Sequence, residues 1–187
     1  MKQENSLSSL SLAILGLISQ QPQSGYDLRK VFSTTPMGHF SSSPGAIYPA
    51  LRRIEAHGSV RPAARPEKNG RQRTTYQITR RGLAILRRHV SQPITRDDVI
   101  WRMDDLMLRF AFMDRLVGRR RTLHFLAELA SEIDRYLVTL RGYLADVKET
   151  IPPCGRLAME QGIAGYKMNA QWARRAIREL SEPKQQP

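Results

Sequence analysis

Apolar residues return every three or four positions in the first part of the chain, which is the spacing of helices with one buried face. Near the N-terminus these positions are Leu7, Leu10, Ile14, Leu17 and Ile18. They predict a first amphipathic helix that ends before the polar turn Gln20–Gln23. A second, short helix is predicted over Tyr26–Phe32, because Ser24 and Asp27 have the spacing of a capping box at its start.

A third helix is predicted after Ser43–Pro44, where serine stands at the N-cap and proline at the first helical position. We expect the side chain of Ser43 to cap this helix. Pro49 has no backbone N–H to donate, so it is expected to tighten or kink the first two turns. Gly58 is expected to end the helix. The buried side is predicted to consist of Ile47, Leu51 and Ile54.

Two short extended segments follow, at Val60–Arg65 and Thr74–Thr79. The pair Asn69–Gly70 between them strongly favours a tight hairpin turn. Because a proline cannot donate to a sheet, Pro62 restricts the first segment to an edge position. A fourth helix is predicted from Thr79–Gly82 onward.

A polar break at residues 91–93 marks the predicted domain boundary. We expect a first domain over residues 1–91, a helical domain over residues 95–182 and a frayed tail over residues 183–187. The helical domain is expected to begin with a capping box and a helix over roughly Arg96–Val117. That helix is apolar on most of its faces and is therefore predicted to be buried on most of them.

The rest of the second half has a heptad pattern, which is typical of a coiled-coil seam. Two interleaved sets of apolar residues, each with a spacing of seven, are Leu123, Ala130, Leu137, Leu144 and Leu126, Ile133, Leu140, Val147. A last helix after Pro152–Pro153 has a similar pattern, and the seam fits packing within one chain or between two chains. The predicted fold is therefore mainly α with a small β-hairpin.

The chain is strongly basic, with 30 Lys and Arg against 17 Asp and Glu among 187 residues. The excess lies in the first half, where residues up to Gln92 include 14 basic and 4 acidic side chains. Such a domain usually binds a polyanion: nucleic acid, an acidic membrane surface or an acidic protein.

Other classes of protein lack support in the sequence. One cysteine excludes a disulfide framework and a cysteine-rich zinc site, and the four histidines lie far apart. There is no nucleotide-binding glycine motif, no nucleophile elbow, no apolar run that could span a bilayer and no signal-peptide pattern. We therefore expect a cytoplasmic protein that is not an enzyme and has no cofactor, no metal and no membrane association.

Three helices, a basic hairpin and a further helix are the element order of a winged helix-turn-helix domain, in which the third helix enters the major groove of DNA. Tyr48 and Arg52 are our main candidates for contact with DNA, although Tyr48 could instead pack against the preceding helix. Ser43 is a candidate for a phosphate at the helix N-terminus, with capping alone as the simpler role. The remaining candidates for binding double-stranded DNA are Arg53, Lys68, Arg71, Arg73 and Arg80, and the alternative for the hairpin is a merely solvated charged loop.

Three linked segments resemble the PadR family of bacterial transcription regulators. They are GYDL at residues 25–28, SPGAIYPALRRIEAHG at residues 43–58 and RQRTTYQITRRG at residues 71–82. They occur in family order within about the first ninety residues. The two-helix, heptad-patterned second half is similar to that of longer members, which dimerise through it.

The resemblance implies a homodimer with two winged helices on one operator, and repression more often than activation. It also implies that a small hydrophobic or aromatic effector can release DNA, without indicating which residues bind it. Trp101 and Trp172 are expected in the core or a dimer interface, with an effector pocket as the alternative. Two rival functions remain open: a nucleoid-associated or RNA-binding protein without sequence selectivity, and a winged-helix adaptor between proteins.

Overall fold

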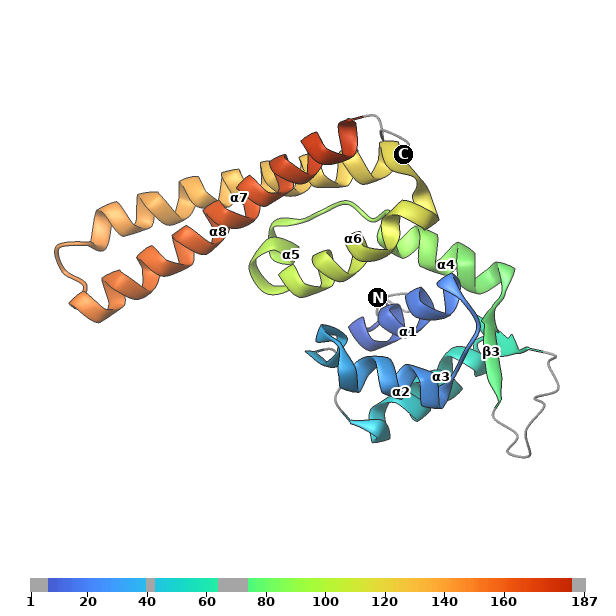
Figure 1. Ribbon diagram of the computed structural model, residues 1–187. Helices are drawn as coiled ribbons and strands as arrows, with labels where there is room; N and C mark the ends of the chain where they lie inside the picture. Colours follow the sequence, from blue (N-terminus) through green and yellow to red (C-terminus); the bar gives the residue numbers. More distant parts are fainter. Residues whose placement is uncertain (1–6, 40–42, 64–73, 183–187) are drawn as a thin grey trace, which may run out of the picture. The chain divides into compact units, whose positions relative to one another are not determined.

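Figure 1 shows the computed structural model of the chain, which describes residues 7–39, 43–63 and 74–182. The backbone divides into two compact units, residues 1–90 and 91–187. The elements of the first unit are α1 (Ser9–Gln20), β1 (Gln23–Ser24), α2 (Gly25–Thr34), the 3-10 helix η1 (Pro36–His39), α3 (Pro44–Ala56), β2 (Val60–Pro62), β3 (Thr75–Ile78) and α4 (Arg80–Val90). Those of the second are α5 (Arg96–Trp101), α6 (Met103–Val117), α7 (Arg119–Val147) and α8 (Pro153–Ser181).

Helix α1 is the central helix of the first unit and contacts α3, β3 and α4. Its buried residues are Leu12, Ala13, Ile14, Leu15, Gly16 and Ile18. The predicted stripe is confirmed at Ile14 and Ile18 and is wrong at Leu7, Leu10 and Leu17, which are only half-buried. Neighbouring elements cover α1 on several sides. Consecutive apolar residues of this helix are therefore buried, and not only those on one face.

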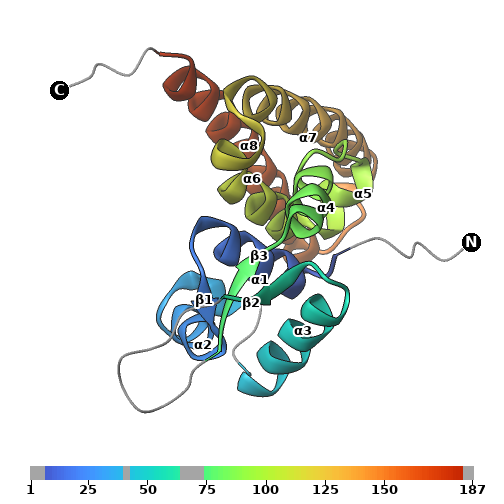
Figure 2. The ribbon, with the colours of Figure 1, turned by 90° about the vertical axis from the view of Figure 1, so that its right-hand side faces the viewer.

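The sheet has three antiparallel strands in the order β1-β3-β2, seen side by side in Figure 2. The predicted pairing of the two extended segments is confirmed, with Val60 opposite Ile78 and Pro62 opposite Tyr76, and β2 is an edge strand. The sequence predicted only two strands, but the sheet has a third, because the two-residue strand β1 also pairs with β3. The predicted turn at residues 69–70 lies outside the described residues.

The end of α3, the sheet and the start of α4 meet at Thr79. Gly58 ends α3 with a positive φ of 69°, as predicted. The hydroxyl of Thr79 donates to the carbonyl oxygens of Gly58 at 2.7 Å and Ser59 at 3.1 Å, and it accepts a hydrogen bond from the N–H of Gly82 at 3.0 Å. One side chain thus caps α4 and fixes the turn that follows α3.

The predicted long helix over residues 96–117 is wrong, because it is two helices. Arg102 has φ −137° and ψ 34°, outside the helical region, and its N–H donates to the carbonyl oxygen of Asp98 at 2.9 Å. The capping box of Thr95 and Asp98 is confirmed at the start of α5. Burial on most faces is also wrong, since Trp101 is 79% exposed and Met103, Met107 and Phe110 are half-buried.

Helices α7 and α8 form an antiparallel hairpin, seen side by side in Figure 1. The heptad seam is therefore packed within the chain. It is buried along the first half of α7, at Leu126, Ala130, Ile133 and Leu137, and faces Ile163, Ala170 and Ala173 of α8. A ring contact between Tyr136 and Tyr166, with centroids 5.0 Å apart, joins the two helices. No helix among the described residues is long and apolar enough to cross a membrane.

Candidate nucleic-acid interface

Helix α3 has one buried and one exposed side. Its buried residues Ile47, Ala50, Leu51 and Ile54 are each at most 4% exposed, which confirms the predicted stripe. Tyr48, Arg52 and Arg53 lie on the exposed side. In Figure 2, α3 stands beside β2 at one side of the sheet. This side of α3 therefore presents an aromatic ring and two guanidinium groups to a partner.

The start of α3 differs from the prediction at Ser43. Ser43 occupies the N-cap position, but its side chain makes no capping hydrogen bond. The N–H of Ala46 donates instead to the backbone carbonyl oxygen of Ser43, at 3.0 Å. Capping by the hydroxyl is therefore wrong, because the backbone itself closes a tight first turn.

Tyr48 contacts helix α2 and remains exposed. Its ring lies against Gly25, where an added Cβ would be only 2.5 Å from the ring atom Cε1 of Tyr48. The residue is nevertheless 44% exposed. The two sequence-based roles are thus compatible, because one side of the ring packs on α2 while the rest faces solvent.

A contact between α3 and the sheet escaped the sequence analysis. Burial raises the pKa of Tyr76 in β3, and the nearby carboxylate of Glu55 in α3 raises it further and accepts a hydrogen bond from its hydroxyl. Tyr76 therefore stays protonated at neutral pH and remains a donor. The positive charge of Arg52 acts on the same hydroxyl in the opposite direction. This contact fixes the position of α3 against the strand that precedes α4.

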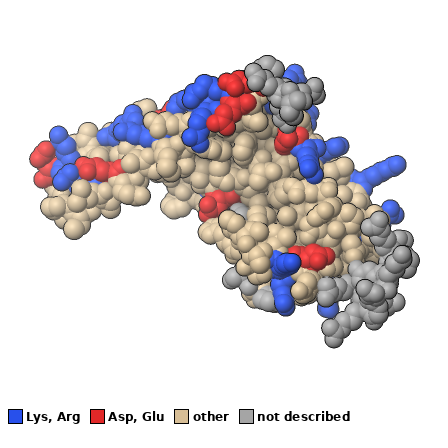
Figure 3. Space-filling model, viewed as in Figure 1, with Lys and Arg blue, Asp and Glu red and all other residues tan. Residues whose placement is uncertain are grey.

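The first unit has exposed cations without acidic partners. Arg52, Arg53 and Arg80 are exposed, and among the described residues none of the three forms an ion pair with a carboxylate. The second unit differs, since Arg174, for example, pairs with Asp134. Figure 3 shows acidic and basic side chains interspersed along the hairpin of α7 and α8. The unpaired positive charge on α3 and α4 is suited to phosphate groups.

Three of the candidate residues, Lys68, Arg71 and Arg73, lie outside the described residues. The strands that flank this segment are antiparallel partners, since Ala63 donates its N–H to the carbonyl oxygen of Thr75 at 2.7 Å. Ala63 and Thr75 therefore lie side by side at the end of the sheet. Three helices, this sheet and the helix α4 define a winged helix-turn-helix unit.

Comparison of the sequence with known protein families gives a match for each of the two units. Residues 14–88 match the profile described as the Transcriptional regulator PadR-like family. Residues 102–181 match the profile described as Virulence activator alpha C-term. Residues 14–88 are therefore a PadR-like transcriptional regulator domain, as the sequence segments predicted, and both profiles describe transcriptional regulators rather than enzymes.

Solved structures with a similar fold include Bacillus subtilis PadR in complex with operator DNA, with 21% identity, coverage of 92% of this chain and 99% of that chain, and a TM-score of 0.41. The same protein in complex with p-coumaric acid has 21% identity, coverage of 93% and 99%, and a TM-score of 0.41. The Vibrio cholerae virulence activator AphA has 22% identity, coverage of 91% and 97%, and a TM-score of 0.37. No curated protein matches the chain. The family assignment therefore rests on the two sequence profiles.

Proposed function

We propose that the chain is a sequence-specific DNA-binding regulator whose helix α3 enters the major groove. The observation that supports this most is the exposed side of α3, where Tyr48, Arg52 and Arg53 stand opposite a fully buried stripe. Arg52 and Arg53 can each donate to a guanine edge or a phosphate, and Tyr48 can donate to a phosphate or pack on a thymine methyl group. Ser43 lies at the helix N-terminus, where a backbone phosphate is favoured.

The segment between β2 and β3 is proposed to act as the wing. Lys68, Arg71 and Arg73 bind phosphate groups that flank the α3 site, and Arg80 at the start of α4 continues the same positive strip. These contacts supply affinity for any duplex. The contacts of α3 supply the preference for one sequence.

The regulator is proposed to act as a homodimer on an inverted repeat, with half-sites about one helical turn apart or a multiple of it. The second unit leaves large apolar side chains exposed in the single chain, which supports a partner surface there. They are Trp101, Val138, Tyr143, Leu157 and Met168. A second copy is the proposed partner, since a symmetric dimer presents the same surface twice.

Repression is the proposed direction of regulation, in the cytoplasm, with release of DNA by a small hydrophobic effector. A bound dimer on an operator blocks access to the DNA that it covers. Release by an effector requires that the effector prefer the DNA-free state of the protein.

The decisive experiment selects duplexes from a random DNA library with the purified protein at near-physiological salt. Enrichment of an inverted repeat is expected. Salt-sensitive binding without enrichment would favour a nucleoid-associated or RNA-binding protein, and absence of DNA binding would favour an adaptor between proteins. The variant Arg52→Ala should weaken binding to the selected sequence more than binding to an unrelated duplex, because α3 contributes the selectivity.

A further inference from the structure

Residues 91–94 form the joint between α4 and α5. Helix α4 ends at Val90, and two residues later the backbone carbonyl oxygen of Gln92 accepts a hydrogen bond from the guanidinium group of Arg109 in α6. Pro93 comes next, and its ring fixes its own φ and confines Gln92 to extended backbone. The joint is therefore short, and it is anchored to the second unit almost as soon as α4 ends.

The residues that follow Pro93 are held to the second unit as well. Ile94 is buried, with 4% of its surface exposed. Thr95 forms the capping box of α5 with Asp98, through a hydrogen bond of 2.7 Å between its hydroxyl and the carboxylate. From Gln92 onward the chain is thus part of the folded second unit.

Arg109, which holds Gln92, is a buried arginine with only 4% of its surface exposed. Its guanidinium group lies 5.1 Å from the centre of the Phe125 ring in α7. Burial lowers the pKa of Arg109, whereas the nearby carboxylates of Asp98 and Glu128 raise it, and an arginine keeps its proton in proteins. A buried charge costs stability compared with an apolar side chain of similar size. The guanidinium group is therefore best explained by the backbone that it holds.

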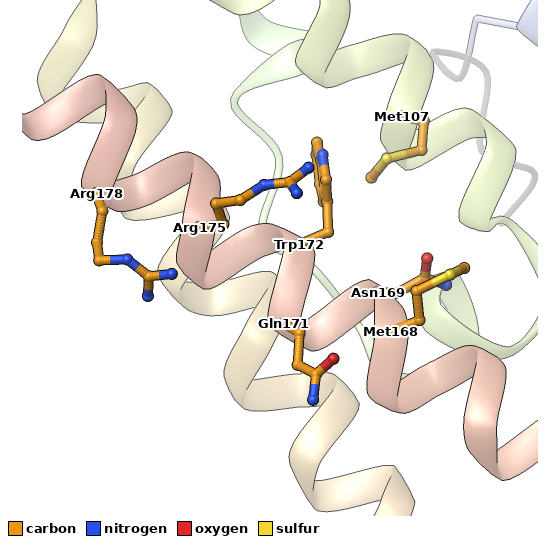
Figure 4. A pocket seen from close by; sticks show the side chains of 7 residues that line it. All are labelled: Met107, Met168, Asn169, Gln171, Trp172, Arg175 and Arg178. Carbon is orange, nitrogen blue, oxygen red and sulfur yellow. The ribbon is translucent and has the colours of Figure 1, made fainter.

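Helix α6, which carries Arg109, is packed against both helices of the α7–α8 hairpin. Phe110 stacks with Phe125 of α7 at a centroid distance of 6.4 Å and meets Trp172 of α8 edge to face at 5.3 Å. In Figure 4 the side chain of Met107 on α6 points toward the same indole. The residues beside Arg109 thus fix the helix from which it reaches the joint.

We propose that Arg109 is a positioning residue that stiffens the joint and thereby restricts the half-site spacings that the regulator accepts. A stiff joint holds the two DNA-binding units of a dimer at one separation and one angle, which favours one spacing. A flexible joint lets the units reach a range of spacings, at a lower effective concentration for each. The effect on spacing rests on the proposed function, because it requires a dimer on an inverted repeat.

The first test measures affinity for duplexes in which the two selected half-sites are moved apart by one to five base pairs. The parent should lose affinity about tenfold when two base pairs are added, because these turn one half-site by about a fifth of a helical turn. Arg109→Met keeps an unbranched side chain but removes the donors, and it should lose only about twofold over the same change. Both proteins should bind a duplex with a single half-site equally well.

Arg96→Met is the matched control. The guanidinium group of Arg96 also lies over an aromatic ring of α7, 5.5 Å from the centre of Tyr136, and Arg96 follows the joint directly. This variant should keep the spacing dependence of the parent. Arg109→Lys, which retains a charged donor, should lie between the parent and Arg109→Met. An equal dependence on spacing in the parent and in Arg109→Met would overturn the proposal.

The second test measures the stiffness of the joint without DNA. Cys154 is the only cysteine and is exposed, so spin labels on it and on Ser33→Cys, at an exposed position of α2, report the distance between the units of one chain. Dilution with unlabelled protein removes distances between chains. The distance distribution should be narrow in the parent and in Arg96→Met, and broad in Arg109→Met. A broad distribution in the parent itself would also overturn the proposal, whether or not Arg109→Met folds.

The two tests separate failure of this proposal from failure of the proposed function. A parent that binds no DNA, with a narrow distribution that broadens in Arg109→Met, would contradict the proposed regulator and leave the role of Arg109 in the joint standing. A parent that binds an inverted repeat with the same spacing dependence as Arg109→Met would contradict that role and leave the regulator standing.

Discussion

At Gly82, α4 lies close against the backbone that leaves α3. A Cβ there would overlap the carbonyl oxygen of Ser59. That oxygen accepts hydrogen bonds from the N–H of Thr79 at 3.0 Å and from its hydroxyl at 3.1 Å. A backbone atom held in this way cannot move aside as the end of a side chain can, so only glycine fits at this position.

Gly82→Ala should therefore lower the free energy of unfolding of the first unit by about 2 kcal/mol, through overpacking. Chemical denaturation followed by circular dichroism measures the effect. Gly45→Ala is the control in the same unit, because its Cβ would lie 3.4 Å from Oγ of Ser43, an ordinary contact. We expect that variant to be as stable as the parent or slightly more stable. Similar losses for both variants would contradict the explanation.

A second prediction concerns Tyr48 and its support on α2. In Gly25→Ala the new methyl group displaces the ring of Tyr48, which is a movable side chain, so the fold should survive with a similar melting temperature. Affinity for the selected operator should fall several-fold. In a Tyr48→Ala background the same substitution should have little further effect on DNA affinity, since coupled residues are not additive. If the effects of the two substitutions on DNA affinity added fully in the double variant, Gly25 would act on DNA binding by a route that does not involve Tyr48.

At the scale of elements, local signals predicted helix starts better than they predicted burial. The capping boxes at Ser24 and Thr95 and the glycine that ends α3 are all present, because each depends on a few adjacent residues. The burial of α1 and the break at Arg102 depend on which neighbours cover each side. The spacing of apolar residues within one helix does not show which neighbours will cover it.

The capping box of α5 gives a prediction that depends on pH. Burial alone would raise the pKa of Asp98, but hydrogen bonds from the hydroxyl and the N–H of Thr95, together with Arg102, outweigh burial and lower it. The folded state therefore binds this proton less tightly than the unfolded state. The resulting stability is fully present above the unfolded pKa, about 3.9, and is lost as the pH falls through the folded pKa.

Asp98→Asn should lower the free energy of unfolding of the second unit by about 1 kcal/mol at neutral pH. The difference from the parent should shrink as the pH falls below about 4. Denaturation curves at several pH values test this. Asp97→Asn, at an exposed neighbouring position, should behave like the parent throughout. A difference for Asp98→Asn that is the same at all pH values would contradict the role of its charge.

At the scale of the whole molecule, the sequence predicted the class of site better than the contacts within it. Charge and element order indicated a DNA-binding surface on α3, where Arg52 and Arg53 are exposed. The packing of Tyr48 on Gly25 and the hydrogen bond between Tyr76 and Glu55 join residues more than twenty positions apart. The ring contact between Phe110 and Trp172 likewise needs α6 and α8 together. Such pairs become visible only when the chain is folded.

The excess positive charge of the first unit predicts a salt-dependent affinity for DNA. Arg71→Ala and Arg73→Ala should each weaken binding to every duplex alike, and should reduce the slope of log affinity against log salt by about 1, because each removes one phosphate contact. Fluorescence anisotropy over a salt series measures this slope. Arg141→Ala, in the second unit, is the control and should leave it unchanged. Unchanged slopes for both wing variants would remove these two residues from the interface.

The central place of α1 has a consequence for synthesis of the protein. This helix leaves the ribosome before β3 and α4, which help to cover it and end only at Ile78 and Val90. Its apolar run from Leu12 to Ile18 therefore stays incompletely covered until about seventy further residues have been added. During that interval the nascent chain offers a binding site for chaperones that hold extended apolar segments. The first unit can therefore complete its core only after its last helix has emerged.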